Sequence, residues 1–69
     1  MRMINIILNG KKTELESTIS IIEFLRSENL ENKMVAVAVN MKIILKNEYK
    51  TTYIKENDKV EVVRPVGGG

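Results

Sequence analysis

The residues with the most evident chemical potential stand together at the end of the sequence, Arg64-Pro65-Val66-Gly67-Gly68-Gly69. Glycine has no β-carbon, so a run of glycines can enter a slot that is too narrow for other residues. A C-terminal carboxyl group has an ordinary pKa of about 3.3–3.7 and is ionised at neutral pH. Because a carboxylate is a poor electrophile, it must first be activated, and adenylation by ATP is the usual route. A sulfur donor could then displace AMP and leave a thiocarboxylate.

The position of the glycines favours this chemical interpretation over a simpler one. Three terminal glycines are also typical of a frayed end or of linker sequence. Here, however, they follow the last predicted strand almost directly and close the sequence. Five residues beyond Arg64 reach roughly 17 Å at about 3.3–3.6 Å per residue. We therefore expect one folded domain over residues 1–64 and a flexible tail over residues 65–69 that is fed into the active site of another protein.

The composition excludes most other chemistry. The sequence contains no Cys and no His, so thiolate nucleophiles, imidazole bases and metal sites built from either residue are excluded. No pair of carboxylates suggests general acid–base catalysis. We expect no catalytic side chain, no metal and no bound cofactor, and the chain is predicted not to be an enzyme.

Charge and hydropathy patterning argue against nucleic-acid and membrane partners. Eleven Lys and Arg residues are spread among nine acidic residues, for a net charge of +2, whereas nucleic-acid binding usually shows a clustered basic patch. The longest apolar run, residues 34–39, is far shorter than a membrane span. The N-terminal segment lacks the continuous apolar region of a signal peptide. These features predict a cytoplasmic protein.

The first half of the sequence predicts a hairpin followed by a helix. Ile4, Ile6 and Leu8 alternate with more polar residues, which indicates a strand with one buried face. Asn9-Gly10 then favours a type I′ turn into a second strand over residues 12–16. Ser20 and Glu23 have the spacing of a capping box, and Asn29 is a plausible helix stop; between them lies an apolar face formed by Ile21, Phe24 and Leu25.

The second half predicts three more strands. Residues 34–40 form the clearest one, with Val35, Val37 and Val39 on the inner face. Residues 43–45 suggest a short edge strand, residues 47–53 a turn or helical turn, and residues 60–63 the last strand. We expect the first and last strands to lie side by side in the centre. The predicted fold class is α+β, with one helix packed across a mixed sheet of four to five strands.

Several stretches of the chain resemble the ThiS family, the sulfur carriers of thiamin biosynthesis, within the group that includes the MoaD proteins and ubiquitin. The matching stretches are Ile6 to Gly10, Ser20 to Leu25, Val35 to Asn40, Asn57 to Val63 and Arg64 to Gly69. The sequence departs from the family at position 41, where the family often has Gly and this chain has Met41. It also departs at Asn57, which replaces a turn glycine, and at Glu28, where an apolar residue is usual.

The resemblance implies a ubiquitin-like β-grasp fold and a defined set of partners. A ThiF-type enzyme would adenylate Gly69 with ATP, and a cysteine desulfurase route would supply sulfur for a thiocarboxylate. A ThiG-type thiazole synthase would then receive the sulfur. By the same resemblance, Gly68 and Gly69 form the Gly-Gly ending of the family, and Val66 and Gly67 belong to the inserted tail.

Strand parity predicts where a partner would dock. If the inner residues face the helix, then Ile7, Ala36, Ala38 and Val63 face outward on neighbouring strands. Together they would form an exposed apolar patch that leads toward Arg64 and the tail. Exposed apolar patches often mark protein–protein interfaces. Scattered exposed apolar residues are also normal in monomeric proteins.

Other functions remain open on the sequence alone. A MoaD-type carrier, the small subunit of molybdopterin synthase, shares Pro65-Val66 ahead of the glycines, although the shorter length favours ThiS. A carrier for tRNA thiolation would be chemically identical at the tail. A β-grasp interaction module with an inert tail would keep its function after deletion of Gly68 and Gly69.

Overall fold

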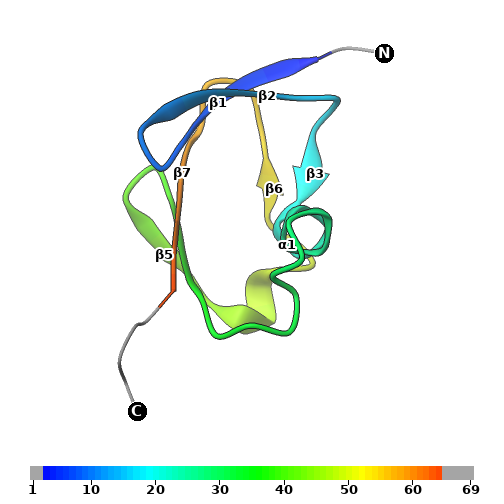
Figure 1. Ribbon diagram of the computed structural model, residues 1–69, viewed down its shortest axis with the longest axis vertical. Helices are drawn as coiled ribbons and strands as arrows, with labels where there is room; N and C mark the ends of the chain where they lie inside the picture. The colour runs from blue at the N-terminus through cyan, green and yellow to red at the C-terminus, as the bar shows by residue number, and fades with distance from the viewer. Residues whose placement is uncertain (1–2, 65–69) are drawn as a thin grey trace.

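The computed structural model describes residues 3–64, so the predicted tail with Val66, Gly67, Gly68 and Gly69 lies outside the described residues. Figure 1 shows how the elements are arranged. In chain order they are β1 (Ile4–Leu8), β2 (Lys11–Leu15), β3 (Ile19–Ser20), α1 (Ile21–Ser27), β4 (Ala36–Val39), β5 (Lys42–Ile44), the 3₁₀ helix η1 (Lys46–Glu48), β6 (Tyr53–Ile54) and β7 (Lys59–Val63).

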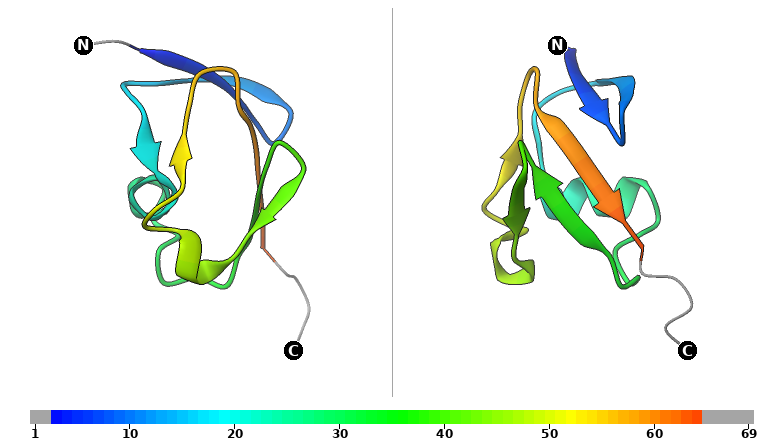
Figure 2. Two further views of the ribbon diagram at one scale, coloured as in Figure 1. Left: turned by 180° about the vertical axis from the view of Figure 1, so that it is seen from behind. Right: turned by 90° about the vertical axis from the view of Figure 1, so that its left-hand side faces the viewer.

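Five of the strands form one mixed sheet in the order β2-β1-β7-β4-β5. β1 and β7 lie side by side, as expected for the first and last strands. They run parallel, and the other adjacent pairs in this sheet are antiparallel. The right-hand view of Figure 2 shows β4 and β7 side by side with α1 behind them. The predicted class, one helix across a mixed sheet, is therefore confirmed for the described residues.

The β1–β2 hairpin follows from the backbone freedom of its two turn residues. Asn9 and Gly10 both have positive φ angles, 50° and 82°, as a type I′ turn requires. The strands pair from Ile4 with Leu15 to Leu8 with Lys11. This register places Ile4 and Ile6, which are 7% and 1% exposed, on the face toward the helix.

Helix α1 begins directly after the predicted cap Ser20 and ends at Ser27, two residues before the predicted stop Asn29. The backbone N–H of Glu23 donates to Ser20 Oγ at 3.2 Å. The return bond of a capping box is not formed, because Glu23 Oε1 instead accepts from the Ser20 hydroxyl at 3.3 Å. At the other end Asn29 has a φ of 60°, and Leu30 N–H donates to Leu25 O at 2.7 Å, the closing bond of a Schellman motif.

Two regions differ from the sequence prediction. The strand expected over residues 34–40 is shorter, since β4 spans only Ala36–Val39. The stretch expected to be a turn or helical turn begins within the 3₁₀ helix η1, as the second alternative allows, but it leads into the unpredicted strand β6, which pairs with β3 in a small separate sheet. Both strands of that sheet have two residues, too few for a periodic pattern to reveal.

The core lies between α1 and the inner face of the large sheet. Phe24 and Leu25 of the helix meet Val37 of β4 and Val60 of β7, and all four are at most 2% exposed. Ile54 of β6 is fully buried and closes the side next to the small sheet. This core fixes β7, the strand that leads to the tail.

Candidate functional site

The predicted site begins where β7 ends. Figure 1 shows β7 running to the end of the molecule opposite the β1–β2 hairpin. Val63, its last residue, is 59% exposed, and Arg64 is exposed next to it. The last two described residues of the chain are therefore open to solvent and to a second protein.

The final residues of β7 are fixed by a side chain from the β1–β2 turn. Val62 N–H donates to Asn9 Oδ1 at 2.9 Å, and Asn9 Nδ2 donates to Val62 O at 3.3 Å. The backbone N–H of Asn9 donates to Val60 O at 2.9 Å. The carboxamide thus imitates one more residue of a parallel strand and extends the pairing of β7 beyond the end of β1.

A second asparagine fixes the start of the same strand. Lys59 N–H donates to Asn40 Oδ1 at 2.9 Å, and Asn40 N–H donates to Lys59 O at 2.7 Å. Asn40 Nδ2 also donates to Asp58 Oδ1 at 3.0 Å. Asn9 and Asn40 both have positive φ, near 50°, so each turn aims its side chain at β7. The strand that carries the tail is therefore held at both ends by turns.

Three of the predicted patch residues lie on adjacent strands. Ala36 of β4 is the cross-strand partner of Val63, and Ala38 is the partner of Glu61. Ala36 and Val63 are exposed, and Ala38 is half-buried. With Arg64 directly after Val63, these residues meet at the end of the sheet from which the tail departs.

Ile43 on the edge strand β5 extends this surface, and the sequence analysis did not select it. It is the cross-strand partner of Ala38 and is 64% exposed. Its signal was present in the alternation of the predicted edge strand, because burial of Ile44 implies an outward Ile43. We call Ala36, Ala38, Ile43 and Val63 the outer strip.

Ile7 does not join the outer strip. It is half-buried on β1, and its neighbours in register are Lys59 on one side and Lys12 on the other. Lys59 and Glu61, both exposed on β7, therefore stand between Ile7 and the apolar residues of β4. Alternation along β1 predicted that Ile7 lies on the outer face, but it could not show that β7, with its polar residues, separates β1 from β4.

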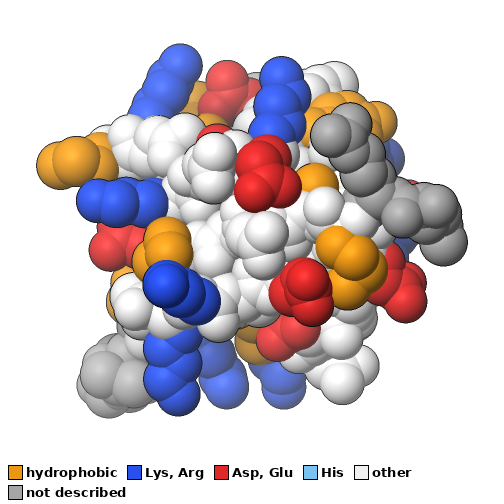
Figure 3. Space-filling view, turned by 90° about the horizontal axis from the view of Figure 1, so that it is seen from above, with side chains coloured by type: hydrophobic (Ala, Val, Ile, Leu, Met, Phe, Trp, Pro, Cys, Tyr) orange, Lys and Arg blue, Asp and Glu red, His pale blue; other side chains and the backbone are white. Residues whose placement is uncertain are grey.

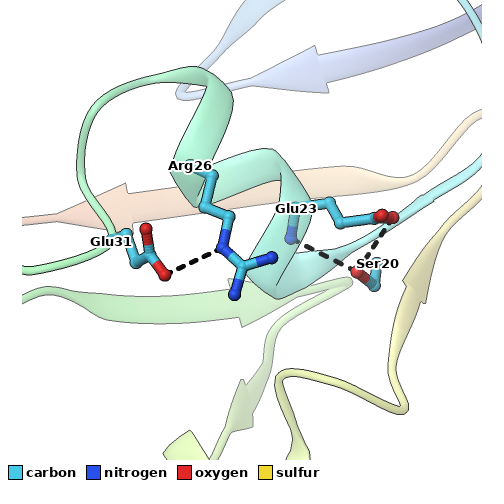
Figure 4. A network of polar contacts seen from close by, with 4 residues as sticks. All are labelled: Ser20, Glu23, Arg26 and Glu31. Carbon is cyan, nitrogen blue, oxygen red and sulfur yellow. Dashed lines mark hydrogen bonds and ion pairs between the residues drawn. The ribbon is translucent and has the colours of Figure 1, made fainter.

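Polar contacts around α1 are structural. Figure 4 shows Ser20 with Glu23 at the helix start and Arg26 with Glu31 beyond its end. Arg26 Nε donates to Glu31 Oε2 at 2.8 Å. The hydrogen bond to Glu31 and its charge raise the pKa of Arg26 above its usual range, so the guanidinium stays cationic. Within residues 3–64, no group of three or more acidic side chains could hold a metal ion.

The surface charge is mixed on the face drawn in Figure 3. Lys and Arg side chains alternate there with Asp and Glu, and hydrophobic side chains are isolated. No helix in the described part of the chain is long and apolar enough to cross a membrane.

The chain is similar in sequence to proteins of a known family. The ThiS family model matches residues 4–69. A sulfur carrier protein ThiS from Bacillus subtilis is 41% identical over 63 residues, which cover 90% of this chain and 96% of that protein. The matched region thus includes both the fold and the glycines at its end.

Two further similarities concern the fold and a larger protein. The crystal structure of a ThiS thiamine biosynthesis protein from Geobacter metallireducens superposes with a TM-score of 0.83 at 25% identity, over 96% of this chain and all of that one. This likeness confirms the ubiquitin-like β-grasp fold. A thiazole synthase from Paramagnetospirillum magneticum is 27% identical over 64 residues, which are 93% of this chain and only 20% of that protein. The chain therefore spans about a fifth of that relative.

Proposed function

This chain belongs to the ThiS family, and on that premise we propose that it is a sulfur carrier of thiamin biosynthesis whose working group is the α-carboxyl group of Gly69. One observation carries the proposal. The family model matches residues 4–69, a range that begins at β1 and ends at Gly69, so it covers the proposed reacting residue as well as the fold. The high coverage of the Bacillus sulfur carrier supports the same function.

The proposed chemistry takes place on the tail. A carboxylate oxygen of Gly69 attacks the α-phosphorus of ATP in the active site of a ThiF-type enzyme, and diphosphate leaves. A persulfide, formed on a partner protein with sulfur from a cysteine desulfurase, then attacks the acyl carbon through its outer sulfur, and AMP leaves. A second thiol of the partner reduces the resulting acyl disulfide, which releases the thiocarboxylate and leaves a disulfide on the partner. The chain becomes a thiocarboxylate and acts as a co-substrate rather than as an enzyme. ATP and the sulfur donor belong to its partners, and no cofactor is proposed for the chain itself.

The small side chains at the end of the sequence suit this delivery. Gly67 and Gly68 lack β-carbons, so the backbone can pass through a narrow channel in the activating enzyme. Val66 is proposed to be inserted into the partner active site together with Gly67 and Gly68. The fold supplies a rigid base for the tail, because β7 is pinned by Asn9 and by Asn40.

Thiazole synthase is the proposed acceptor. A region similar to this chain occupies a fifth of the Paramagnetospirillum thiazole synthase. Joining two modules in one polypeptide raises the effective concentration of each for the other, which is useful when the two act in sequence. We propose that the same encounter delivers sulfur from this chain to a thiazole synthase, and we propose the cytoplasm as its site.

The outer strip is the proposed docking surface for the ThiF-type enzyme. Val63 and Ile43 are large aliphatic side chains that are 59% and 64% exposed. Ala36 and Ala38 between them leave the surface low enough for a partner to approach closely. Exposed apolar surface of this kind marks interaction sites, and this one adjoins the start of the tail.

The acceptor can be tested with the thiocarboxylated chain. It is offered in parallel to a thiazole synthase with its other substrates and to the large subunit of a molybdopterin synthase. The proposal expects sulfur transfer to the thiazole product and none to the pterin. Transfer only to the pterin would assign the chain to the MoaD-type role, and retention of function after deletion of Gly68 and Gly69 would leave an interaction module with an inert tail.

A further inference from the structure

A groove runs beside the edge strand β5, and its lining includes Ala36 and Ile43 of the outer strip as well as core residues on the helix side of the sheet. One wall is the loop after α1, residues 31–34, and the other is the segment after β5, residues 45–50. Both segments lie at the lower end of the molecule in Figure 1, below α1. The groove has a volume of about 880 Å³, within the range of sites that hold a ligand of substantial size.

The floor of the groove is apolar and firmly built. Leu25, Ile44 and Tyr49 line it and are 1%, 8% and 7% exposed, so their positions are fixed by the core. Met34 on one wall and Leu45 on the other are 84% and 59% exposed. Large apolar side chains therefore remain accessible on both walls above a fixed floor.

The rim of the groove is cationic. Lys33 lines it from the loop after α1, and Lys46 and Lys50 line it from the opposite wall; all three are exposed. The acidic residue in the lining is Glu31, whose carboxylate accepts the hydrogen bond from Arg26 at 2.8 Å. The charge of Glu31 is thus matched from outside the groove, and the three lysines stand without an acidic counterpart in its lining.

We propose that this groove binds an acidic segment of a partner protein, with aliphatic side chains seated between Met34 and Leu45. The carboxylates of the segment would face Lys33, Lys46 and Lys50. An apolar floor between cationic walls is complementary to a peptide in which acidic and aliphatic residues alternate. The inference does not rest on the chemistry of Gly69, because it concerns binding alone.

Other anionic partners fit the groove less well. Single-stranded nucleic acid is bound by stacking bases on exposed aromatic rings, and the aromatic residue of this lining, Tyr49, is 93% covered. An anionic membrane is flat on this scale, so it would reach the lysines and leave the floor empty. A protein segment is the ligand that uses both features.

The test is a titration of the isotope-labelled chain, followed by amide chemical shifts. The probe is a synthetic peptide of alternating Glu and Leu, and the same peptide with Lys in place of Glu is its control. The proposal expects saturable shifts in residues 31–35 and 44–50 with the acidic peptide, weaker binding at high salt, and little binding of the basic peptide.

Charge-reversed variants locate the site. K33E together with K46E should weaken binding of the acidic peptide at least about tenfold, whereas the matched pair K11E and K12E on the opposite sheet edge should leave it unchanged. All four lysines are exposed, and the spectra themselves report that the variants are folded. Equal binding of both peptides, equal losses in both double variants, or shifts confined to Ala38 and Val63, which do not line the groove, would overturn the proposal. Shifts in the same groove with single-stranded RNA or anionic vesicles, but not with the acidic peptide, would also overturn it.

Discussion

The carboxamide of Asn9 makes both possible backbone hydrogen bonds with Val62, accepting from its N–H at 2.9 Å and donating to its carbonyl at 3.3 Å. The two residues are 53 positions apart in the sequence, and the turn and the tail-bearing strand meet only in the fold. Val62 is two residues before Arg64, so this contact fixes the direction in which the chain leaves the domain. It links a hairpin turn to the presentation of the proposed reacting group.

Replacing Asn9 should loosen the base of the tail. Asn9→Ala removes both side-chain bonds and puts alanine, which tolerates the left-handed region less well than asparagine, at a φ of 50°; the free energy of unfolding should therefore fall by about 2 kcal/mol. Asn9→Gly removes the same bonds but suits the positive φ, so it should cost only about 1 kcal/mol. Urea unfolding measures both values, and hydrogen exchange at the Val62 amide reports the lost bond. Unchanged protection of that amide in both variants would contradict the assigned role.

The β4–β5 turn offers a stabilising substitution. Met41 has a φ of 70° and is 87% exposed, so it bears left-handed strain without any packing in return. Met41→Gly should relieve about 1–2 kcal/mol of strain and lose part of that gain to the greater freedom of the unfolded chain. A net gain of about 0.5–1 kcal/mol is expected in urea unfolding. Lys42→Gly, one residue later within β5, is the control and should destabilise; a loss of stability in Met41→Gly would contradict the account.

The same Ser→Ala substitution should have different effects on stability at the two ends of α1. Ser20 is 3% exposed and its hydroxyl accepts from Glu23 N–H, so Ser20→Ala should cost about 1 kcal/mol of unfolding free energy. Ser27 is the matched control, because its hydroxyl only donates to Phe24 O within the helix. Ser27→Ala should change stability by less than about 0.5 kcal/mol. Equal effects of the two substitutions in thermal unfolding would show that the N-cap hydrogen bond of Ser20 does not stabilise the protein more than the hydroxyl of Ser27 does.

Docking on the outer strip can be tested separately from folding. Val63 is 59% exposed, so Val63→Asp should leave the protein folded. A carboxylate there would have to be desolvated in the complex, and the KM for the carrier in adenylation by the ThiF-type enzyme should rise at least about tenfold, equivalent to about 1.4 kcal/mol. Met41→Asp introduces the same charge at the far end of β4 and should change the KM little. An unchanged KM for Val63→Asp would remove the outer strip from the docking surface.

Local signals explain why so much of the fold could be predicted. Period-two alternation identified β1 and β7, the Asn9-Gly10 pair identified the first hairpin, and Ser20 with Asn29 marked the ends of α1. Each of these features acts within a few residues of its own position. The small β3–β6 sheet left no such signal, because two-residue strands are defined only by the partner they meet in space.

The candidate site shows the same limit. Parity placed Val63, Ala36 and Ala38 on the outer face, and the register brings them together with Ile43. It separates Ile7 from them by Lys59 and Glu61, which parity alone could not show because it does not specify which residues become neighbours. The contact of Asn9 with Val62 was likewise hidden, because a turn asparagine looks alike in sequence whether or not its side chain reaches another strand. The roles of Val66, Gly67, Gly68 and Gly69 remain predictions, since they lie outside the described residues.

The most direct test of the central claim is the intact mass of the chain after incubation with a ThiF-type enzyme, ATP and a sulfur donor. The account predicts that one oxygen is replaced by sulfur, that the change maps to the C-terminal peptide containing Gly69, and that a variant lacking Gly69 does not acquire it. An unmodified mass, obtained with an enzyme shown to be active on its own carrier, would contradict the claim that Gly69 is the sulfur-carrying residue.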